Sequence, residues 1–587
     1  MIREKQLRIG NLNARLKRFI KSIAILLLLT PLSVFAWNKA PIDITKTSLS
    51  ELEYYLNEGI VTSSDLVKLY LDRIEYYKDY NAIITTNEKA LQEAEVLDKE
   101  RSLGKTRSAL HGIPIIVKDN IDVLNMPTTA GAKALKDNYP KADAEVIKKL
   151  KDAGVIILAK TNMSEFAFLS SSSRSTYGTV KNAYNKDYSS YGSSGGSAVG
   201  VALNLAPLAL GTDTNSSVRV PASASSLVGY RPTTGNLSNK GVLPYDPERD
   251  TIGLLTKTVS DSLELLNLII DNKYKISMPN LKGITIGVPE NFYKGSDNNK
   301  LPENKETYEE IQKLMTNAIQ KLESNGAKIV YLKEYYTTDS DYLVSNSYSG
   351  YLFCDSFNKY IQNTTGSIRS FESLSKSSNK LNDISNYAAS CNTTRTLDEK
   401  NKNKQKYSNY IEKIYTDNNL DVIIYPTTKN KLLKAGSAGI INTSAHAAST
   451  INYPAISMPL GFDKDNLPYG LEFMATKNQD EKLFNIVNIY EKINPINKPE
   501  IAPNLYKIDE SVIDLLNNYQ SPQKVILKNN WKNKVKEIFK TYNENKNVEK
   551  EAKKLNQEYK KRILFLRLIK IVLLLLIFLY IRSKFKK

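Results

Sequence analysis

Residues 191–200, "YGSSGGSAVG", decide how the rest of the sequence is interpreted. Three interpretations are open: a flexible Gly/Ser connector, a G-x-S-x-G nucleophile elbow around Ser194, or serines linked to a base elsewhere in the chain. The connector fails because "SAVGVALNLAPLAL" follows directly, and flexible linkers avoid such apolar residues. The choice between the other two decides the chemistry.

A nucleophile elbow at Ser194 requires a histidine base. The chain has two histidines, His111 and His446, and the order Ser–Asp–His leaves His446 with an acid such as Asp421. The G-x-S-x-G pattern is short and often arises by chance. This α/β-hydrolase interpretation predicts that His446→Ala abolishes turnover.

The third interpretation needs a base other than histidine, and Lys118 is the candidate. It stands at the polar end of the apolar run "IPIIV", which predicts a buried strand. Burial disfavours a charged lysine and lowers its pKa from about 10.4, so that a neutral amine can take a proton from a serine. The structural alternative is that Lys118 only pairs with Asp119 or Asp122.

Residues 208–223, "LALGTDTNSSVRVPAS", place Ser217 in a tight turn after an apolar run. Successive backbone N–H groups in such a turn can form an anion-binding nest, which is what an oxyanion hole requires. Alternating helix and strand patterns, such as the helix expected over residues 143–154 and the strand over residues 153–162, predict an α/β fold.

At this point the chain resembles the amidase signature family of serine amidohydrolases. The likeness runs in order from about residue 42 to 490, and its motifs are "LHGIPIIVKDN", "TTAGAKAL", "AKTNMSEFA", "YGSSGGSAVGVALNLAPLALGTDTNSSVRVPAS", "DTIGLLTKTVSD", "DVIIYPT", "YPAISMPLGF" and "NLPYGLEFMATKNQDEKLF". The resemblance implies a mixed central β-sheet covered by helices on both faces.

The resemblance also implies a Lys–Ser–Ser proton relay. Lys118 would be the base, Ser193 the bridging serine after a cis peptide bond, and Ser217 the nucleophile that forms an acyl-enzyme. No metal or cofactor is needed. The remaining implied residues are the backbone N–H groups of Thr214, Asn215, Ser216 and Ser217 as the oxyanion hole, with Ser194, Asp213 and Arg219 as supports.

One departure concerns the two residues before the implied nucleophile. The family usually has two glycines there, whereas this chain has Asn215 and Ser216. Glycine permits positive φ and close approach of the backbone to a substrate. Asn tolerates left-handed geometry better than Ser does, so a reshaped oxyanion hole is expected. An alternative function follows: a catalytically impaired envelope protein that acts by binding.

The formal charge of +19 lies at the two ends of the chain. Residues 1–36 carry a net charge of +6 and residues 524–587 one of +14, which leaves the rest almost neutral. Such an arrangement favours a membrane over nucleic acid as the partner. Residues 1–36, with basic residues before an apolar run that ends in "SVFA", predict a secretory signal peptide, with an uncleaved membrane anchor as the alternative.

The carboxyl terminus predicts a membrane anchor. Residues 563–581 are 19 mostly apolar residues, about 28 Å as a helix, and the basic residues after them suit a cytoplasmic tail. An amphipathic helix on anionic lipid is the alternative.

The expected organisation is a signal peptide (1–36), an amidase domain (37–505), a charged juxtamembrane stalk (506–562), a transmembrane helix (563–581) and a basic tail (582–587). The chain is thus expected to be an exported, membrane-anchored amidase that cleaves a small, peptide or lipid carboxamide. Cytoplasmic transfer-RNA amidotransferase subunits of the family do not fit this export. Cys354 and Cys391 are the two cysteines, and a disulfide between them is an open alternative.

Overall fold

The computed structural model describes residues 39–40, 42–292, 305–333, 335, 349–381, 397–436, 441, 443 and 445–508. One compact unit ends at Lys507. The expected signal peptide, transmembrane helix and basic tail lie outside the described residues, as does nearly all of the stalk. Among the helices that are described, none has the length and apolar character needed to cross a membrane. Cys391 also lies outside this part, and with it the alternative of a disulfide to Cys354.

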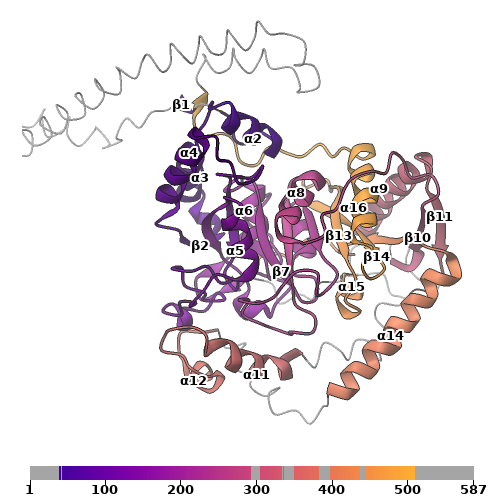
Figure 1. The fold of residues 1–587 in the computed structure, drawn as a ribbon. Coiled ribbons are helices and arrows are strands. Elements are labelled where there is room, and N and C mark those ends of the chain that lie inside the picture. Colours follow the sequence, from indigo (N-terminus) through magenta and orange to yellow (C-terminus); the bar gives the residue numbers. More distant parts are fainter. Residues whose placement is uncertain are drawn as a thin grey trace, which may run out of the picture. The chain divides into compact units, whose positions relative to one another are not determined.

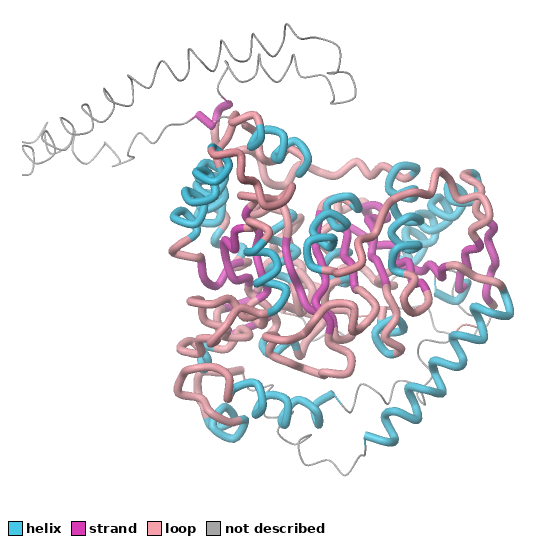
Figure 2. Tube along the Cα trace, viewed as in Figure 1, coloured by secondary structure: helices cyan, strands magenta, loops and turns pink. Residues whose placement is uncertain are grey.

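A mixed sheet of eleven strands forms the centre of the unit, in the order β11-β10-β12-β14-β13-β8-β9-β7-β3-β4-β2 (Figures 1 and 2). The strands of the described part are β1 Lys39–Ala40, β2 Ile83–Thr86, β3 Pro114–Lys118, β4 Ile156–Thr161, β5 Arg174–Ser175, β6 Gly178–Thr179, β7 Ala209–Asp213, β8 Val228–Arg231, β9 Thr251–Thr256, β10 Thr285–Pro289, β11 Lys328–Leu332, β12 Val422–Pro426, β13 Ala455–Phe462, β14 Pro468–Ala475 and β15 Lys507–Ile508.

Helices alternate with these strands along much of the chain. The described α-helices are α2 Leu49–Asn57, α3 Ser63–Tyr76, α4 Ala90–Ser102, α5 Glu145–Asp152, α6 Gly195–Ala202, α7 Arg219–Ser223, α8 Val259–Ile269, α9 Lys305–Ser324, α11 Ser349–Ile361, α12 Phe371–Lys376, α14 Leu397–Asn418, α15 His446–Thr450 and α16 Asp480–Ile493. Two elements expected from local sequence patterns are present. Thr62 caps α3 through a capping box with Asp65, and the strand expected before Lys118 is β3, buried along its whole length.

Helices cover both faces of the sheet, and two consecutive residues of β8 demonstrate this. Consecutive side chains of a strand point to opposite faces. A Cβ atom on Gly229 would meet the side chain of Ala222 in α7, whereas the ring of Tyr230 contacts that of Phe484 in α16, with ring centroids 4.7 Å apart. α7 and α16 therefore lie on opposite faces, which confirms the expected mixed sheet between helices.

Three strands that run in the same direction end together at one edge of the sheet. β3 and β7 are parallel neighbours, with Ile116 opposite Ala209. β9 is antiparallel to both β7 and β8, so β8 runs in the direction of β7. Because the carboxyl ends of such strands share an edge, Lys118, Asp213 and Arg231 are brought together although they are far apart in the sequence.

Candidate active site

Lys118, the last residue of β3, is fully buried. Its ammonium nitrogen lies 2.7 Å from Ser193 Oγ and 2.7 Å from Thr212 Oγ1, and it also contacts the Thr212 carbonyl at 3.2 Å. Burial lowers the pKa of Lys118 to about 7, although Asp213 and Asp250 act to raise it. Lys118 therefore contacts the bridging-serine candidate rather than pairing with Asp119, whose carboxylate lies beside Lys160.

Ser193 follows a cis peptide bond with Gly192, as the resemblance implied. Its carbonyl accepts hydrogen bonds from the Ser164 N–H at 3.1 Å and from Ser173 Oγ at 3.2 Å. The Ser173 hydroxyl also accepts from the Gly195 N–H at 2.9 Å. These contacts fix the backbone on both sides of Ser193, so that its hydroxyl is held against Lys118.

Two glycines in this segment are required by close packing. A Cβ atom on Gly192 would lie 2.5 Å from the Leu169 carbonyl oxygen, and one on Gly196 would overlap the carbonyl of Asn162. Real Cβ atoms do not approach backbone oxygens so closely. The Gly-rich composition of residues 191–200 therefore reflects a tightly packed turn, which explains why the connector interpretation fails.

Ser217 lies in the turn between β7 and α7 and is 3% exposed. Its carbonyl accepts a hydrogen bond from the Ser194 N–H at 3.1 Å, which ties this turn to the Ser193 segment. Among the described residues, no group accepts a hydrogen bond from the backbone N–H groups of residues 214–217. Successive free N–H groups of this kind can bind an oxyanion.

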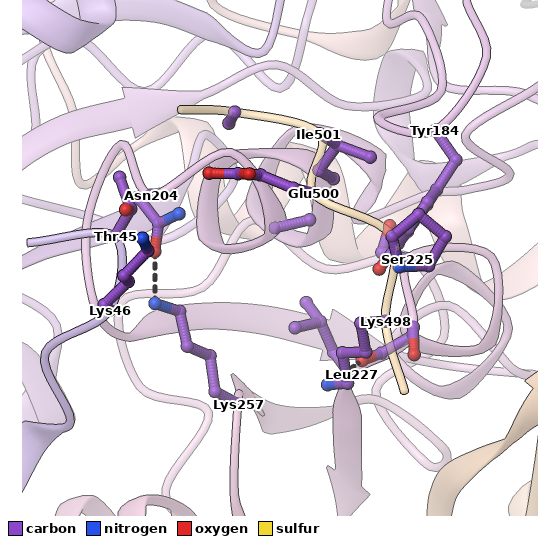
Figure 3. A pocket seen from close by; sticks show the side chains of 14 residues that line it. Thr45, Lys46, Tyr184, Asn204, Ser225, Leu227, Lys257, Lys498, Glu500 and Ile501 are labelled. Atoms are coloured by element: carbon purple, nitrogen blue, oxygen red, sulfur yellow. Dashed lines mark hydrogen bonds between the residues drawn. The ribbon is translucent and has the colours of Figure 1, made fainter. Parts of the chain in front are cut away.

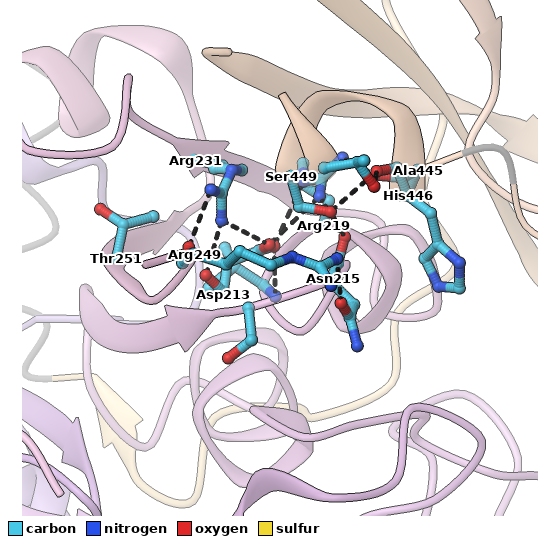
Figure 4. Close-up of polar contacts among 12 residues, drawn as sticks. Asp213, Asn215, Arg219, Arg231, Arg249, Thr251, Ala445, His446 and Ser449 are labelled. Atoms are coloured by element: carbon cyan, nitrogen blue, oxygen red, sulfur yellow. Dashed lines mark hydrogen bonds and ion pairs between the residues drawn. The ribbon is translucent and has the colours of Figure 1, made fainter. Parts of the chain in front are cut away.

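A buried ionic network supports the turn (Figure 4). The Asp213 carboxylate accepts from the Val218 N–H at 3.0 Å and contacts Arg219 and Arg231 at 3.1 Å each. Arg219 also pairs with Glu472 of β14. Burial acts to raise the pKa of Asp213, but the two arginines outweigh it and hold the value below its usual range. The network therefore keeps Asp213 ionised at neutral pH.

Ser194 and Arg219 also hold the backbone of the two site segments. The Ser194 hydroxyl donates to the Thr212 carbonyl at 3.2 Å and accepts from the Thr212 N–H at 3.3 Å. Arg219 Nη2 donates to the Asn215 carbonyl at 2.7 Å, and Ser449 Oγ donates to the same oxygen at 2.6 Å. Because these two hydrogen bonds hold its carbonyl, the backbone of Asn215 keeps a defined orientation.

The expectation about Asn215 and Ser216 is corrected in one respect. Neither residue has a positive φ, so the backbone here does not require the conformation that glycine favours. The Asn215 side-chain oxygen accepts from Arg249, and the Ser216 hydroxyl is buried with no hydrogen-bond partner among the described residues. The substitutions therefore fill space beside the turn without forcing left-handed geometry on it.

The histidine interpretation does not fit the described contacts. The Ser194 hydroxyl is engaged with Thr212, and Asp421 binds the Thr285 N–H and Lys482. Burial lowers the pKa of His446 to about 4, and Arg249 and Arg219 contribute to this lowering. Figure 4 shows the His446 ring extending away from the ionic network, without a drawn contact. No Ser–His–Asp arrangement is formed by these described residues.

Several residues of the site were not found by sequence reasoning. Thr212 and Asn120 contact each other at 3.0 Å beside Lys118, and both stand within motifs that carry the resemblance. Arg231 and Glu472 were also missed. A single charged residue at a strand end or inside a strand does not reveal in the sequence whether it belongs to a site. Its ionic partner is identified only in the folded chain.

Comparison with known proteins identifies the family of the chain. The family model described as Amidase matches residues 65–484. Mandelamide hydrolase of Pseudomonas putida is 30% identical over 483 residues, covering 77% of this chain and 92% of that protein. The glutamyl-tRNA(Gln) amidotransferase A-type subunit of Clostridium botulinum is 31% identical over 493 residues, covering 77% of this chain and 98% of that protein.

A solved amidase structure is also similar to this chain. The native peptide amidase of Stenotrophomonas maltophilia is similar with a TM-score of 0.69 and 28% sequence identity, covering 78% of this chain and 99% of that chain. The matched residues contain both segments of the site. The chain belongs to the amidase signature family, and it is a hydrolase of amide C–N bonds.

Proposed function

We propose that this protein is an exported, membrane-anchored amidase that cleaves a carboxamide through an acyl-enzyme on Ser217. The observation that supports this most strongly is the buried Lys118 amine, 2.7 Å from the Ser193 hydroxyl. An amine with a pKa of about 7 is neutral in an appreciable fraction of molecules at neutral pH, and only the neutral form accepts a proton.

In the proposed reaction, the Ser217 oxygen attacks the carbonyl carbon of the amide. Its proton passes to Ser193 while the Ser193 proton passes to Lys118. The backbone N–H groups of residues 214–217 stabilise the oxyanion of the tetrahedral intermediate. Lys118 then returns the proton through Ser193 to the leaving nitrogen, the C–N bond breaks, and water hydrolyses the resulting ester.

The substrate class is proposed from the relatives. The similar proteins include a mandelamide hydrolase and a peptide amidase. A small aromatic amide and a peptide amide are therefore the first substrates to test. The comparison also includes amidotransferase subunits. Their substrate is not a first choice for testing, because residues 1–36 and 563–581 of this chain favour export and anchoring.

A catalytically impaired binding protein is the second candidate, and Asn215 and Ser216 motivate it. The described backbone argues against it, since neither residue has a positive φ and no described group takes up the N–H groups of the turn. Lys118, Ser193 and Ser217 are also all retained.

The test uses the full chain in detergent, a panel of amides and a measurement of released ammonia or amine. The Ser217→Ala variant is the matched control, because it removes one oxygen atom. We expect turnover and a fluorophosphonate adduct on Ser217 in the parent protein and neither in the variant. A folded parent protein that hydrolyses no amide and forms no adduct would support the binding candidate instead.

Anchoring and export are tested separately. We expect the protein to stay with membranes after carbonate extraction and to be digested by protease added outside intact cells or spheroplasts. A chain that lacks residues 563–587 is expected to be released from the membrane. Recovery of the full chain in the soluble cytoplasmic fraction would contradict this part of the proposal.

A further inference from the structure

Figure 3 shows a cavity, with a volume of about 350 Å³. The places of its lining residues on the strands put it at the edge of the sheet opposite to the active site. Among the residues that line it, Asn204 precedes β7, Leu227 precedes β8 and Lys257 follows β9. β7 and β8 point their carboxyl ends toward the site, and β9 runs the other way. These three residues are therefore at the far ends of the strands that position Asp213 and Arg231.

The cavity is separate from the reaction site. β7 crosses the sheet from Ala209 to Asp213, and strands rise about 3.3 Å per residue, so the two edges are roughly 13 Å or more apart. None of the residues proposed for the reaction lines the cavity. Any ligand here would bind without touching Ser217.

Lysine side chains dominate the charge of the cavity. Lys46, Lys257 and Lys498 line it, and Glu500 is the one carboxylate among its described lining residues. The Lys257 ammonium donates to the Asn204 side-chain oxygen, and the Lys498 ammonium donates to the Ser226 carbonyl at 2.7 Å. Both acceptors are neutral, so each ammonium keeps donors for another partner.

Neither Lys257 nor Lys498 forms an ion pair with a carboxylate in the part of the chain that the structure describes. Burial lowers the pKa of Lys257 to about 8, while Asp261 acts to raise it and Lys498 and Arg73 act to lower it. Burial also lowers the pKa of Lys498, while the carboxylates of Glu491 and Asp261 act to raise it without forming a direct ion pair. Both lysines are therefore buried without a direct ionic partner among the described residues, and a bound anion would stabilise their charged forms.

The wall of the cavity is formed by both ends of the described domain. Thr45 and Lys46 come from its beginning, and residues 498–502 cross it from the end. Ile501 and Leu227 add apolar surface beside the lysines. The cavity is larger than a single tetrahedral anion, which leaves room for the remainder of a phosphorylated molecule.

We propose that this cavity binds a phosphate group between Lys257 and Lys498, either as part of a soluble phosphorylated molecule or as a lipid headgroup. Lysine binds phosphate as a compact point charge with three donors. The lipid source is included because residues 509–587, in which the sequence predicts a membrane helix, follow directly from the segment that covers the cavity. The binding goes beyond the proposed amide hydrolysis and does not depend on it.

The test measures how fast Lys257 is acylated by an amine-reactive reagent, by peptide mass spectrometry of the full chain. Inorganic phosphate is titrated at constant ionic strength against chloride, with the protein in detergent. In a second arm the protein is placed in phosphatidylcholine nanodiscs with or without phosphatidylglycerol. Exposed Lys273 is the internal control for reagent strength.

We expect phosphate to slow acylation of Lys257 but not of Lys273. Lys498→Gln should raise the phosphate concentration for half-protection about fivefold, since one cationic contact contributes about that factor, whereas Lys273→Gln should leave it unchanged. Protection by phosphatidylglycerol beyond that by phosphatidylcholine identifies the headgroup as the source, and protection by phosphate alone identifies a soluble one.

The proposal is overturned if neither phosphate nor phosphatidylglycerol protects Lys257, or if Lys498→Gln binds phosphate as the parent protein does. Circular dichroism of each variant verifies folding. Amide hydrolysis is measured in parallel, so failure of the phosphate site and failure of the proposed amidase activity are distinguished.

Discussion

Replacing Lys118 by methionine tests the buried base directly. Holding Lys118 at a pKa of about 7 instead of 10.5 makes folding less favourable by about 5 kcal/mol at pH 7 and below, at about 1.4 kcal/mol per pH unit. Between pH 7 and 10.5 the unfolded chain binds more protons than the folded chain, so this term makes stability rise with pH. Below pH 7 both forms are protonated and the term is constant.

The Lys118→Met variant lacks this term, so its stability relative to the parent protein should fall by about 2 kcal/mol between pH 7 and pH 9. The unpaired hydroxyls of Ser193 and Thr212 add a penalty of about 1–3 kcal/mol that does not depend on pH. The change of this stability difference with pH, and not its size at one pH, therefore tests the buried base. It is measured by chemical unfolding of the full chain in detergent, with Lys273→Met as the surface control.

The same variant should lose amide hydrolysis by about 10²–10⁴-fold, the usual contribution of a positioned base. In the parent protein the rate should rise with pH through about 7, because the neutral amine is the active form, and then level off. A stability difference that is flat from pH 7 to pH 9, or a Lys118→Met variant with more than about a tenth of the parent rate, would refute the buried neutral base.

Three further substitutions test other parts of the site. His446→Ala should retain most of the parent rate of amide release, because the imidazole is outside the proton path, and abolition of turnover would restore the histidine interpretation. Asp213→Asn leaves two buried arginines undercompensated and should lower the free energy of unfolding by about 3–5 kcal/mol, with Asp187→Asn on the exposed surface as control. Gly196→Ala would force a Cβ atom against the Asn162 carbonyl and should lower the melting temperature through about 1–3 kcal/mol of strain; an unchanged melting temperature would contradict the tight packing of this turn.

Much of the fold near the site could be predicted because the signals are local. Lys118 ends a run of apolar residues, and that run is β3. The helix expected over residues 143–154 is α5, and the following strand is β4. Each of these depends on the spacing of apolar residues within a short window.

The parts that could not be predicted depend on distant pairing. The strand signal of β11 is weak in the sequence, because β11 is a partly exposed edge strand with a short apolar pattern. In the site, the contact of Arg219 with Glu472 joins residues 253 positions apart. Glu472 stands alone in the apolar run "YGLEFMA", but the sequence does not identify Arg219 as its partner.

The contact between Arg219 and Glu472 implies that possession of the reactive side chains is insufficient for hydrolysis. A chain cut or terminated before β14 would still contain every proposed participant in proton transfer, yet its guanidinium group would lose a counter-ion beneath the nucleophile turn. Such fragments should lack hydrolase activity, so incomplete translation or proteolytic trimming before β14 should not yield an active enzyme.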